Sequence, residues 1–245
     1  LYLAAIGLSI AQIGVLMALP QVLRIVGPPF WGWMADRGGS RVLLLRERPP
    51  RAELIDLEAG REVAAIELHV PAGHPLHDAW TDPEGSAGEG AVLLAGGHLL
   101  VAKEKDPRVL IEFGPPGEPS QGLAHPVPVP AGGWPASGDR RYVPLATWRP
   151  GPRLHDACRD LSDLDVGPDR RLYALSDRSA AIARLGPLPP GGGEVEADAV
   201  WPLPDVDGKP EGLAFTAGGH AVVGLDRGGT RRNLVVTTPP VAPPR

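Results

Sequence analysis

Acidic side chains recur at one fixed spacing in three segments of the chain. Residues 89–104, 162–177 and 211–226 align without gaps, and each opens with a polar pair and closes with an acid 15 residues later. The opening pairs are Glu89-Gly90, Ser162-Asp163 and Glu211-Gly212, and the closing acids are Glu104, Asp177 and Asp226. Carboxylates that converge on one axis could supply the oxygen ligands that a hard cation such as Ca²⁺ prefers.

We therefore expect these polar residues to lie at one binding site for a small molecule. The channel candidates are Glu89, Ser162, Asp163, Glu211, Glu104, Asp177 and Asp226, and Glu89 and Glu211 are the candidate ligands for Ca²⁺. A structural alternative stays open: the opening acids accept backbone N–H bonds, and the closing acids form solvated ion pairs worth under about 1 kcal/mol each. The sequence contains no Gly-x-Ser-x-Gly, His-Glu-x-x-His or Cys-x-x-Cys motif, so no catalytic residue is predicted.

The elements that would position these residues are short strands. Each aligned segment contains two apolar runs around a turn that includes Gly or Asp, which is typical of a hairpin. Third strands are predicted at 109–114, 181–186 and 233–237, and fourth strands at 142–148 and 195–203. Repeated four-stranded antiparallel units predict a β-propeller, whose blades pack side by side. A β-sandwich is the alternative, and the fixed spacing disfavours it.

One further blade is predicted at the start of this region. Residues 52–68 fit the third and fourth strands of a blade, so its first two strands would have to lie upstream. Upstream of it, however, the sequence has an apolar run at residues 10–35. The propeller is therefore predicted to be incomplete at this junction.

The apolar run at residues 10–35 is long enough to cross a hydrocarbon core of about 30 Å as a helix. A single charge, Arg24, lies within the first 35 residues, whereas five arginines follow between 37 and 51. The positive-inside rule then places residues after 36 in the cytoplasm, with membrane lipid as the partner of the helix. A buried core helix and a signal peptide are the alternatives.

The same region resembles a transporter family. The stretch GLSIAQIG at 7–14, Arg24, and PPFWGWMADRGGSR at 28–41 resemble the second transmembrane helix and following loop of major facilitator transporters, in the branch of phenylpropionate and nucleoside permeases. The family's loop motif is matched by Gly32, Asp36, Arg37 and Gly39. Such a transporter has about twelve helices, so the resemblance implies a fragment without a transport path.

The strand region resembles a different group. The stretches GEGAVLL, LLVAKEKDP, LSDLDVGPDRRLYALSDRS, KPEGLAF and VVGLD resemble bacterial propellers of the esterase-like phytase and SdiA-regulated type, over residues 52–238. This resemblance implies a propeller fold, but it implies no reaction, because a fold does not determine an activity.

The expected fold is mainly β: an incomplete β-propeller of four-stranded antiparallel blades preceded by one transmembrane helix. The expected division is a transporter-like segment at 1–41, a basic junction at 42–51 and a partial propeller at 52–245. With 24 basic and 29 acidic residues, the net charge of −5 disfavours nucleic acid as a partner. Because the sequence begins with Leu, we expect it to start inside a longer protein.

The predicted function is a membrane-tethered propeller binding module of unassigned activity, encoded by a truncated or fused gene. Two alternatives stay open. One is a propeller hydrolase, acting on esters or phosphoesters, that uses the carboxylate cluster with Ca²⁺. The other is a fragment of a major facilitator transporter.

Overall fold

The computed structural model describes residues 41–56, 60–82, 87–128, 141–203, 208–227 and 233–243. This part of the chain is mainly β, with strands β1 to β15 and two short helices, α3 and α4. Within the same ranges, no helix is long and apolar enough to span a bilayer. The predicted helix at 10–35 and the transporter motif at Gly32–Gly39 lie outside the described residues.

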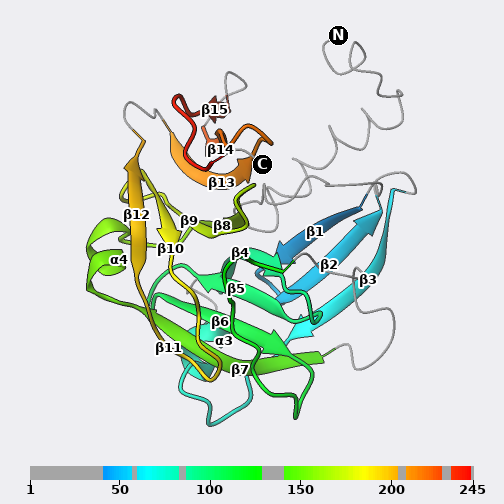
Figure 1. Ribbon diagram of the computed structural model, residues 1–245. Helices are drawn as coiled ribbons and strands as arrows, with labels where there is room; N and C mark the ends of the chain where they lie inside the picture. Colours follow the sequence, from blue (N-terminus) through cyan, green and yellow to red (C-terminus); the bar gives the residue numbers. More distant parts are fainter. Residues whose placement is uncertain are drawn as a thin grey trace.

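Four groups of antiparallel strands, called blades 1 to 4 here, follow one another along the chain (Figure 1). Blade 1 contains β1 (Arg41–Arg46), β2 (Arg51–Asp56) and β3 (Arg61–Leu68). Blade 2 contains β4 (Gly88–Leu93), β5 (Leu99–Lys103), β6 (Val109–Gly114) and β7 (Arg141–Pro150). Blade 3 contains β8 (Asp163–Val166), β9 (Leu172–Ser176), β10 (Ala181–Leu185) and β12 (Ala197–Pro202), and blade 4 contains β13 (Lys209–Phe215), β14 (Ala221–Asp226) and β15 (Leu234–Val236).

The predicted repeat is confirmed strand by strand. The three aligned segments form the hairpins β4–β5, β8–β9 and β13–β14, and the predicted third strands are β6, β10 and β15. The predicted fourth strands are β7 and β12. The alternation of apolar residues and the Gly-containing turns were therefore sufficient to place these strands.

Blade 1 differs from its prediction. Residues 52–68 form β2 and β3, but β1 precedes them at Arg41–Arg46, which begins at the last residue of the expected transporter-like segment and continues into the expected basic junction at 42–51. β1 pairs with β2 over six residues and contacts β4 of the next blade. Leu43 and Leu45 pack into the core on one side of this strand. Because arginines lie at both ends of this short apolar run, the sequence analysis did not assign it as a strand. The expectation that two strands of this blade are missing upstream of residue 52 is therefore wrong, since β1 is one of them.

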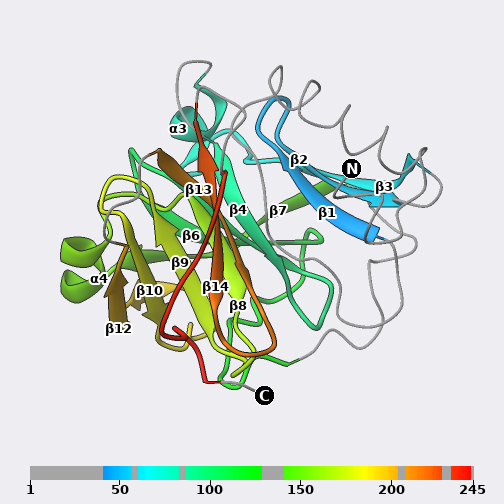
Figure 2. The ribbon, with the colours of Figure 1, turned by 90° about the horizontal axis from the view of Figure 1, so that it is seen from above.

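The blades pack face to face in chain order, with their first strands side by side. β8 contacts both β4 and β13, and Figures 1 and 2 show these three strands adjacent. One apolar cluster fills each interface: Val101 and Ile66 between blades 1 and 2, Leu100 and Leu172 between blades 2 and 3, and Leu175 and Val223 between blades 3 and 4. Sheets that pack face to face with their neighbours in this way form a propeller-like array.

Connections between the blades add features that the repeat does not predict. The last two residues of β3 pair in parallel with the start of β7, which joins blades 1 and 2 at their outer edge. β11 (Gly193–Val195) pairs in parallel with the end of β7 and so links blade 3 to blade 2. The short helices α3 (His77–Thr81) and α4 (Pro152–Ala157) precede blades 2 and 3.

Candidate functional site

The opening and closing residues of the repeat meet at one end of the array. In each hairpin the first strand begins where the second strand ends, as shown by the pairs Gly88 with Lys103 and Lys209 with Asp226. Because the first strands of blades 2, 3 and 4 are neighbours, these ends come together. We call this group of carboxylates the acidic rim; it comprises Glu47, Glu89, Glu104, Asp177, Glu211 and Asp226.

Glu89 is the most buried carboxylate of the acidic rim, with 9% of its surface exposed. Burial raises its pKa to about 9, and a hydrogen bond and the negative charge of Glu47 add to this effect. The charges of Glu104 and Glu211 raise it further. At neutral pH the Glu89 carboxyl is therefore protonated, although it lies among other acids.

Glu211 occupies the corresponding position on β13. Burial raises its pKa to about 7, and the negative charges of Asp226, Asp177 and Glu104 act in the same direction, against the positive charge of Lys209. The pKa of Asp177 is also raised, by burial first and then by Asp160 and Glu104. The rim is thus one electrostatic unit contributed by three repeats, and its protonation changes near neutral pH.

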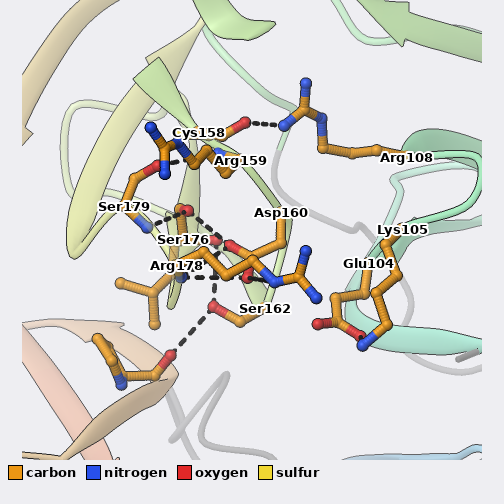
Figure 3. A network of polar contacts seen from close by, with 12 residues as sticks. Glu104, Lys105, Arg108, Cys158, Arg159, Asp160, Ser162, Ser176, Arg178 and Ser179 are labelled. Carbon is orange, nitrogen blue, oxygen red and sulfur yellow. Dashed lines mark hydrogen bonds and ion pairs between the residues drawn. The ribbon is translucent and has the colours of Figure 1, made fainter. Parts of the chain in front are cut away.

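Basic side chains lie beside the acidic rim. Lys105 forms an ion pair with Glu104 at 2.7 Å, and Figure 3 shows Arg178 near this pair. Lys103 is almost completely buried, and its ammonium group donates to the carbonyl of Lys105 at 2.5 Å. Burial lowers the pKa of Lys103.

A second set of polar contacts fixes the turn that carries Asp177. Asp160 is fully buried and accepts the hydroxyl hydrogen bond of Ser176 at 2.6 Å and the backbone N–H of Arg178 (Figure 3). Ser179 in turn accepts the backbone N–H of Arg159 at 2.9 Å. The turn is therefore tied to the segment that enters blade 3, and this holds Asp177 in place.

Ser162 and Asp163, the two remaining predicted residues, connect blades instead of facing an open site. The Ser162 hydroxyl donates to the carbonyl of Pro210 at 3.0 Å, and the Asp163 carboxylate accepts the N–H of Leu213 at 2.7 Å. Asp165, two residues further along β8, accepts the N–H of Phe215. Successive inward side chains of β8 thus satisfy N–H groups at the edge of β13.

Of the seven predicted residues, the structure brings five together in the acidic rim and places two at the interface between blades. Sequence analysis did not identify Glu47, which follows β1 in a stretch of arginines outside the repeat. Among the residues that the structure describes, no group of three or more His, Cys, Asp or Glu side chains could hold a metal ion. Binding of a ligand or of Ca²⁺ stays a prediction.

A separate polar network lies at the opposite end of blade 2 and was not predicted. His98 is buried between two carboxylates, with Nδ1 at 2.6 Å from Glu112 and Nε2 at 2.8 Å from Glu118. Glu112 also accepts hydrogen bonds from the Ser120 hydroxyl and from the N–H groups of Gln121 and Gly122. We call His98, Glu112, Glu118 and Ser120 the His98 network.

The electrostatics of the His98 network are opposite to those of the rim. Burial alone would lower the pKa of His98, but hydrogen bonds to Glu112 and Glu118 outweigh it and raise this pKa. Burial alone would raise the pKa of Glu112, but the hydrogen bonds it accepts, first that of His98, lower it. Both ring nitrogens face carboxylates, which favours the charged imidazole, and these contacts anchor the loop after β6. We assign this network a structural role.

Comparison with known proteins gives one family match and several structural likenesses. A family model described as the MFS_1 like family matches residues 1–47. This match supports the transporter-like interpretation of the N-terminal segment, and it extends through β1 of blade 1. No curated protein sequence matches the chain.

Three solved structures resemble the chain, each with a TM-score of 0.37. The WD40 β-propeller domain of Doa1 is 9% identical over 83% of this chain, and the Cps50 (Swd1) β-propeller domain of Myceliophteria thermophila is 8% identical over 84%. A Bacteroides caccae protein of unknown function is 14% identical over 86% of this chain and 70% of its own. The chain spans 48% of the Doa1 domain and 51% of the Cps50 (Swd1) domain. At this level of similarity, the propeller-like assignment rests on the strand pairing described above.

Proposed function

We propose that the chain is a propeller-type binding module whose acidic rim recognises a small ligand that carries a positive charge. The observation behind this proposal is the convergence of carboxylates from three repeats. Two of these carboxylates have raised pKa values, Glu89 at about 9 and Glu211 at about 7. Perturbed acids gathered at one end of a scaffold are typical of ligand sites. A cation would replace the protons that these acids hold and would relieve their mutual repulsion.

We further propose that residues 10–35 tether the module to a membrane, with the residues after 36 in the cytoplasm. The match of residues 1–47 to the MFS_1 like family and the arginines after residue 36 support this arrangement. The resemblance of the repeats to esterase-like phytase and SdiA-regulated propellers supports the type of fold. It does not support any particular reaction for this chain. A fused or truncated gene would explain both resemblances, and the genomic DNA encoding residues 41–51 tests it.

The ligand proposal is tested by calorimetry on the purified full chain with 1,4-diaminobutane as the cationic probe. Binding should release protons, seen as a dependence of the heat on the ionisation enthalpy of the buffer, and it should tighten as pH rises from 6 to 8. Glu211→Gln should weaken binding about tenfold, which corresponds to about 1.4 kcal/mol. Glu194→Gln, on the exposed strand β11, is the matched control.

Two further arms separate the alternatives. Binding of Ca²⁺ but not of the diamine would replace the proposed ligand with a metal ion. Hydrolysis of p-nitrophenyl acetate or p-nitrophenyl phosphate that is lost in Glu89→Gln would favour the hydrolase. If neither probe binds, or if Glu211→Gln binds the diamine as tightly as the unaltered chain, the proposed function is wrong.

A further inference from the structure

Residues 115–127, which follow β6 and which we call the strap, connect blade 2 to blade 3. The N–H of Leu123 donates to the carbonyl of Leu188 in the loop after β10 at 2.8 Å, and the N–H of Leu188 donates back at 2.9 Å. Further along, the N–H of Val127 donates to the carbonyl of Arg170 at 2.6 Å. Leu123 and Val127 are buried in the apolar cluster between the two blades. The second half of the strap is therefore fixed to blade 3.

Two side chains of blade 2 bind the first half of the strap. Glu112 on β6 accepts hydrogen bonds from one hydroxyl and two backbone N–H groups of residues 120–122. His98, in the turn before β5, lies 2.8 Å from Glu118 through Nε2. The contact between His98 and Glu118 thus holds the part of the strap that precedes the bonds to Glu112.

The charged groups that face His98 come from β6 and from the strap. Glu112 faces Nδ1 and Glu118 faces Nε2. From β7, the hydroxyl of Tyr142 donates to the carbonyl of Gly97 at 3.1 Å, and burial raises its pKa above 10, so this group stays neutral. Burial disfavours the charged imidazole and the two carboxylates favour it, so its second proton is retained while both carboxylates stay close.

A neutral imidazole cannot satisfy both carboxylates. It has one N–H donor and one lone pair, so it donates to only one of them. Glu112 is fully buried, whereas the side chain of Glu118 is 51% exposed. A buried charge without its donor is costly, and a charge that can move into water is not. The remaining proton therefore stays on Nδ1, and the lone pair of Nε2 then repels the carboxylate of Glu118.

We propose that the strap is a pH-sensitive latch, in which the charged form of His98 holds Glu118 and the neutral form releases it. On release, residues 115–119 open and Nε2 of His98 becomes accessible to water, whereas residues 120–127 stay bound to Glu112 and to blade 3. Local opening of this kind begins where few buried contacts are lost. Because the two carboxylates raise the pKa of His98 above 6.5, release occurs as pH rises through that higher value. This inference is independent of the function proposed for the acidic rim.

Modification of the full chain with diethyl pyrocarbonate tests the latch, because this reagent reacts with the unprotonated nitrogen of an accessible imidazole. Mass spectrometry gives the rate at His98 relative to His69, whose side chain is 40% exposed. For the unaltered chain this ratio should rise about tenfold from pH 6 to pH 9. Glu118→Gln should keep the ratio low at both pH values. Its amide accepts from the charged ring and donates to the lone pair of the neutral ring, so the latch stays closed.

Three results would overturn the proposal. The first is a ratio that stays low at pH 9 in the unaltered chain, and the second is a ratio that rises as far in Glu118→Gln as in the unaltered chain. The third comes from nitrogen-15 NMR of the His98 ring at pH 9, where the latch requires the Nδ1–H tautomer and the Nε2–H tautomer would contradict it. Glu194→Gln should behave as the unaltered chain does, and near-native tryptophan fluorescence checks that each variant folds.

Discussion

The two ends of blade 2 contain carboxylates in opposite surroundings. At one end Glu89 faces other acids of the rim, and its pKa is raised to about 9. At the other end Glu112 is fully buried, faces His98 and three further donors, and has a lowered pKa. The same type of side chain therefore costs stability in the rim and adds stability in the His98 network. A costly arrangement in one place is expected where a site serves function instead of folding.

The largest effect should come from removing the buried acid of the His98 network. Glu112→Ala leaves His98 and the N–H groups of Gln121 and Gly122 without their acceptor, and loss of one partner of a buried pair costs about 3–5 kcal/mol. Urea unfolding of the full chain, followed by tryptophan fluorescence, measures this loss. A loss below about 1 kcal/mol would mean that the network does not hold the loop.

Glu89→Gln should change stability in the opposite direction. In the folded chain the pKa of Glu89 is raised from 4.5 to about 9, so the folded state keeps a proton that the unfolded state releases. The stability of the unaltered chain should therefore fall as pH rises from about 4.5 to 9. Glutamine cannot ionise, so the variant should be more stable at pH 8, by about 1–3 kcal/mol, and should lose part of this pH dependence.

Unfolding at pH 5 and pH 8 measures the difference, with Glu194→Gln as the control. If Glu89→Gln is instead destabilised at pH 8, the Glu89 carboxylate makes a favourable interaction that offsets its burial, and the contrast with Glu112 fails.

The acidic rim could be predicted from the sequence, whereas the His98 network at the other end of blade 2 could not. The acidic rim follows from the 15-residue spacing, because opening and closing residues of a hairpin must lie at the same end of a sheet. The His98 network does not follow from any motif. Glu112 and Glu118 lie on β6 and in the loop after it, and only tertiary packing brings them to His98 in the β4–β5 turn.

Blade 1 shows the same limit for the fold. Blades 2 to 4 have a repeated pattern that could be aligned, whereas β1 reads as leucines between arginines and follows an apolar segment. Its assignment depends on the pairing of Leu43 with Leu54 and of Leu45 with Ala52, contacts that the sequence does not display. Glu47 was missed for the same reason, because its place in the rim depends on β1.

Asp165 allows the effect of burial on a carboxyl pKa to be measured without the contribution of neighbouring acids that acts in the rim. Burial raises its pKa from 3.8 to about 7, against the hydrogen bonds that it accepts from Val166 and Phe215. Stability should fall as pH rises from about 3.8 to 7, because the folded state again retains the proton. Asp165→Asn keeps an acceptor for Phe215 and should gain about 1 kcal/mol at pH 8 and nothing at pH 4. An equal gain at both pH values in urea unfolding would exclude this titration as the cause.

The smallest effect is expected at the exposed member of the His98 network. The side chain of Glu118 is 51% exposed, and Glu118→Gln keeps an oxygen that can accept the Nε2 hydrogen bond of His98. Only a partly screened charge is lost, so the stability should change by less than about 1 kcal/mol.

The variant nevertheless lowers the pKa of His98. A raised imidazole pKa gives stability that is complete below 6.5 and is lost as pH rises through the folded value. In Glu118→Gln this loss should be complete at a lower pH, which unfolding at pH 6, 7 and 8 and the NMR titration of the His98 ring would detect. A loss as large as that of Glu112→Ala would show that the exposed acid, and not the buried one, holds His98 in its charged form.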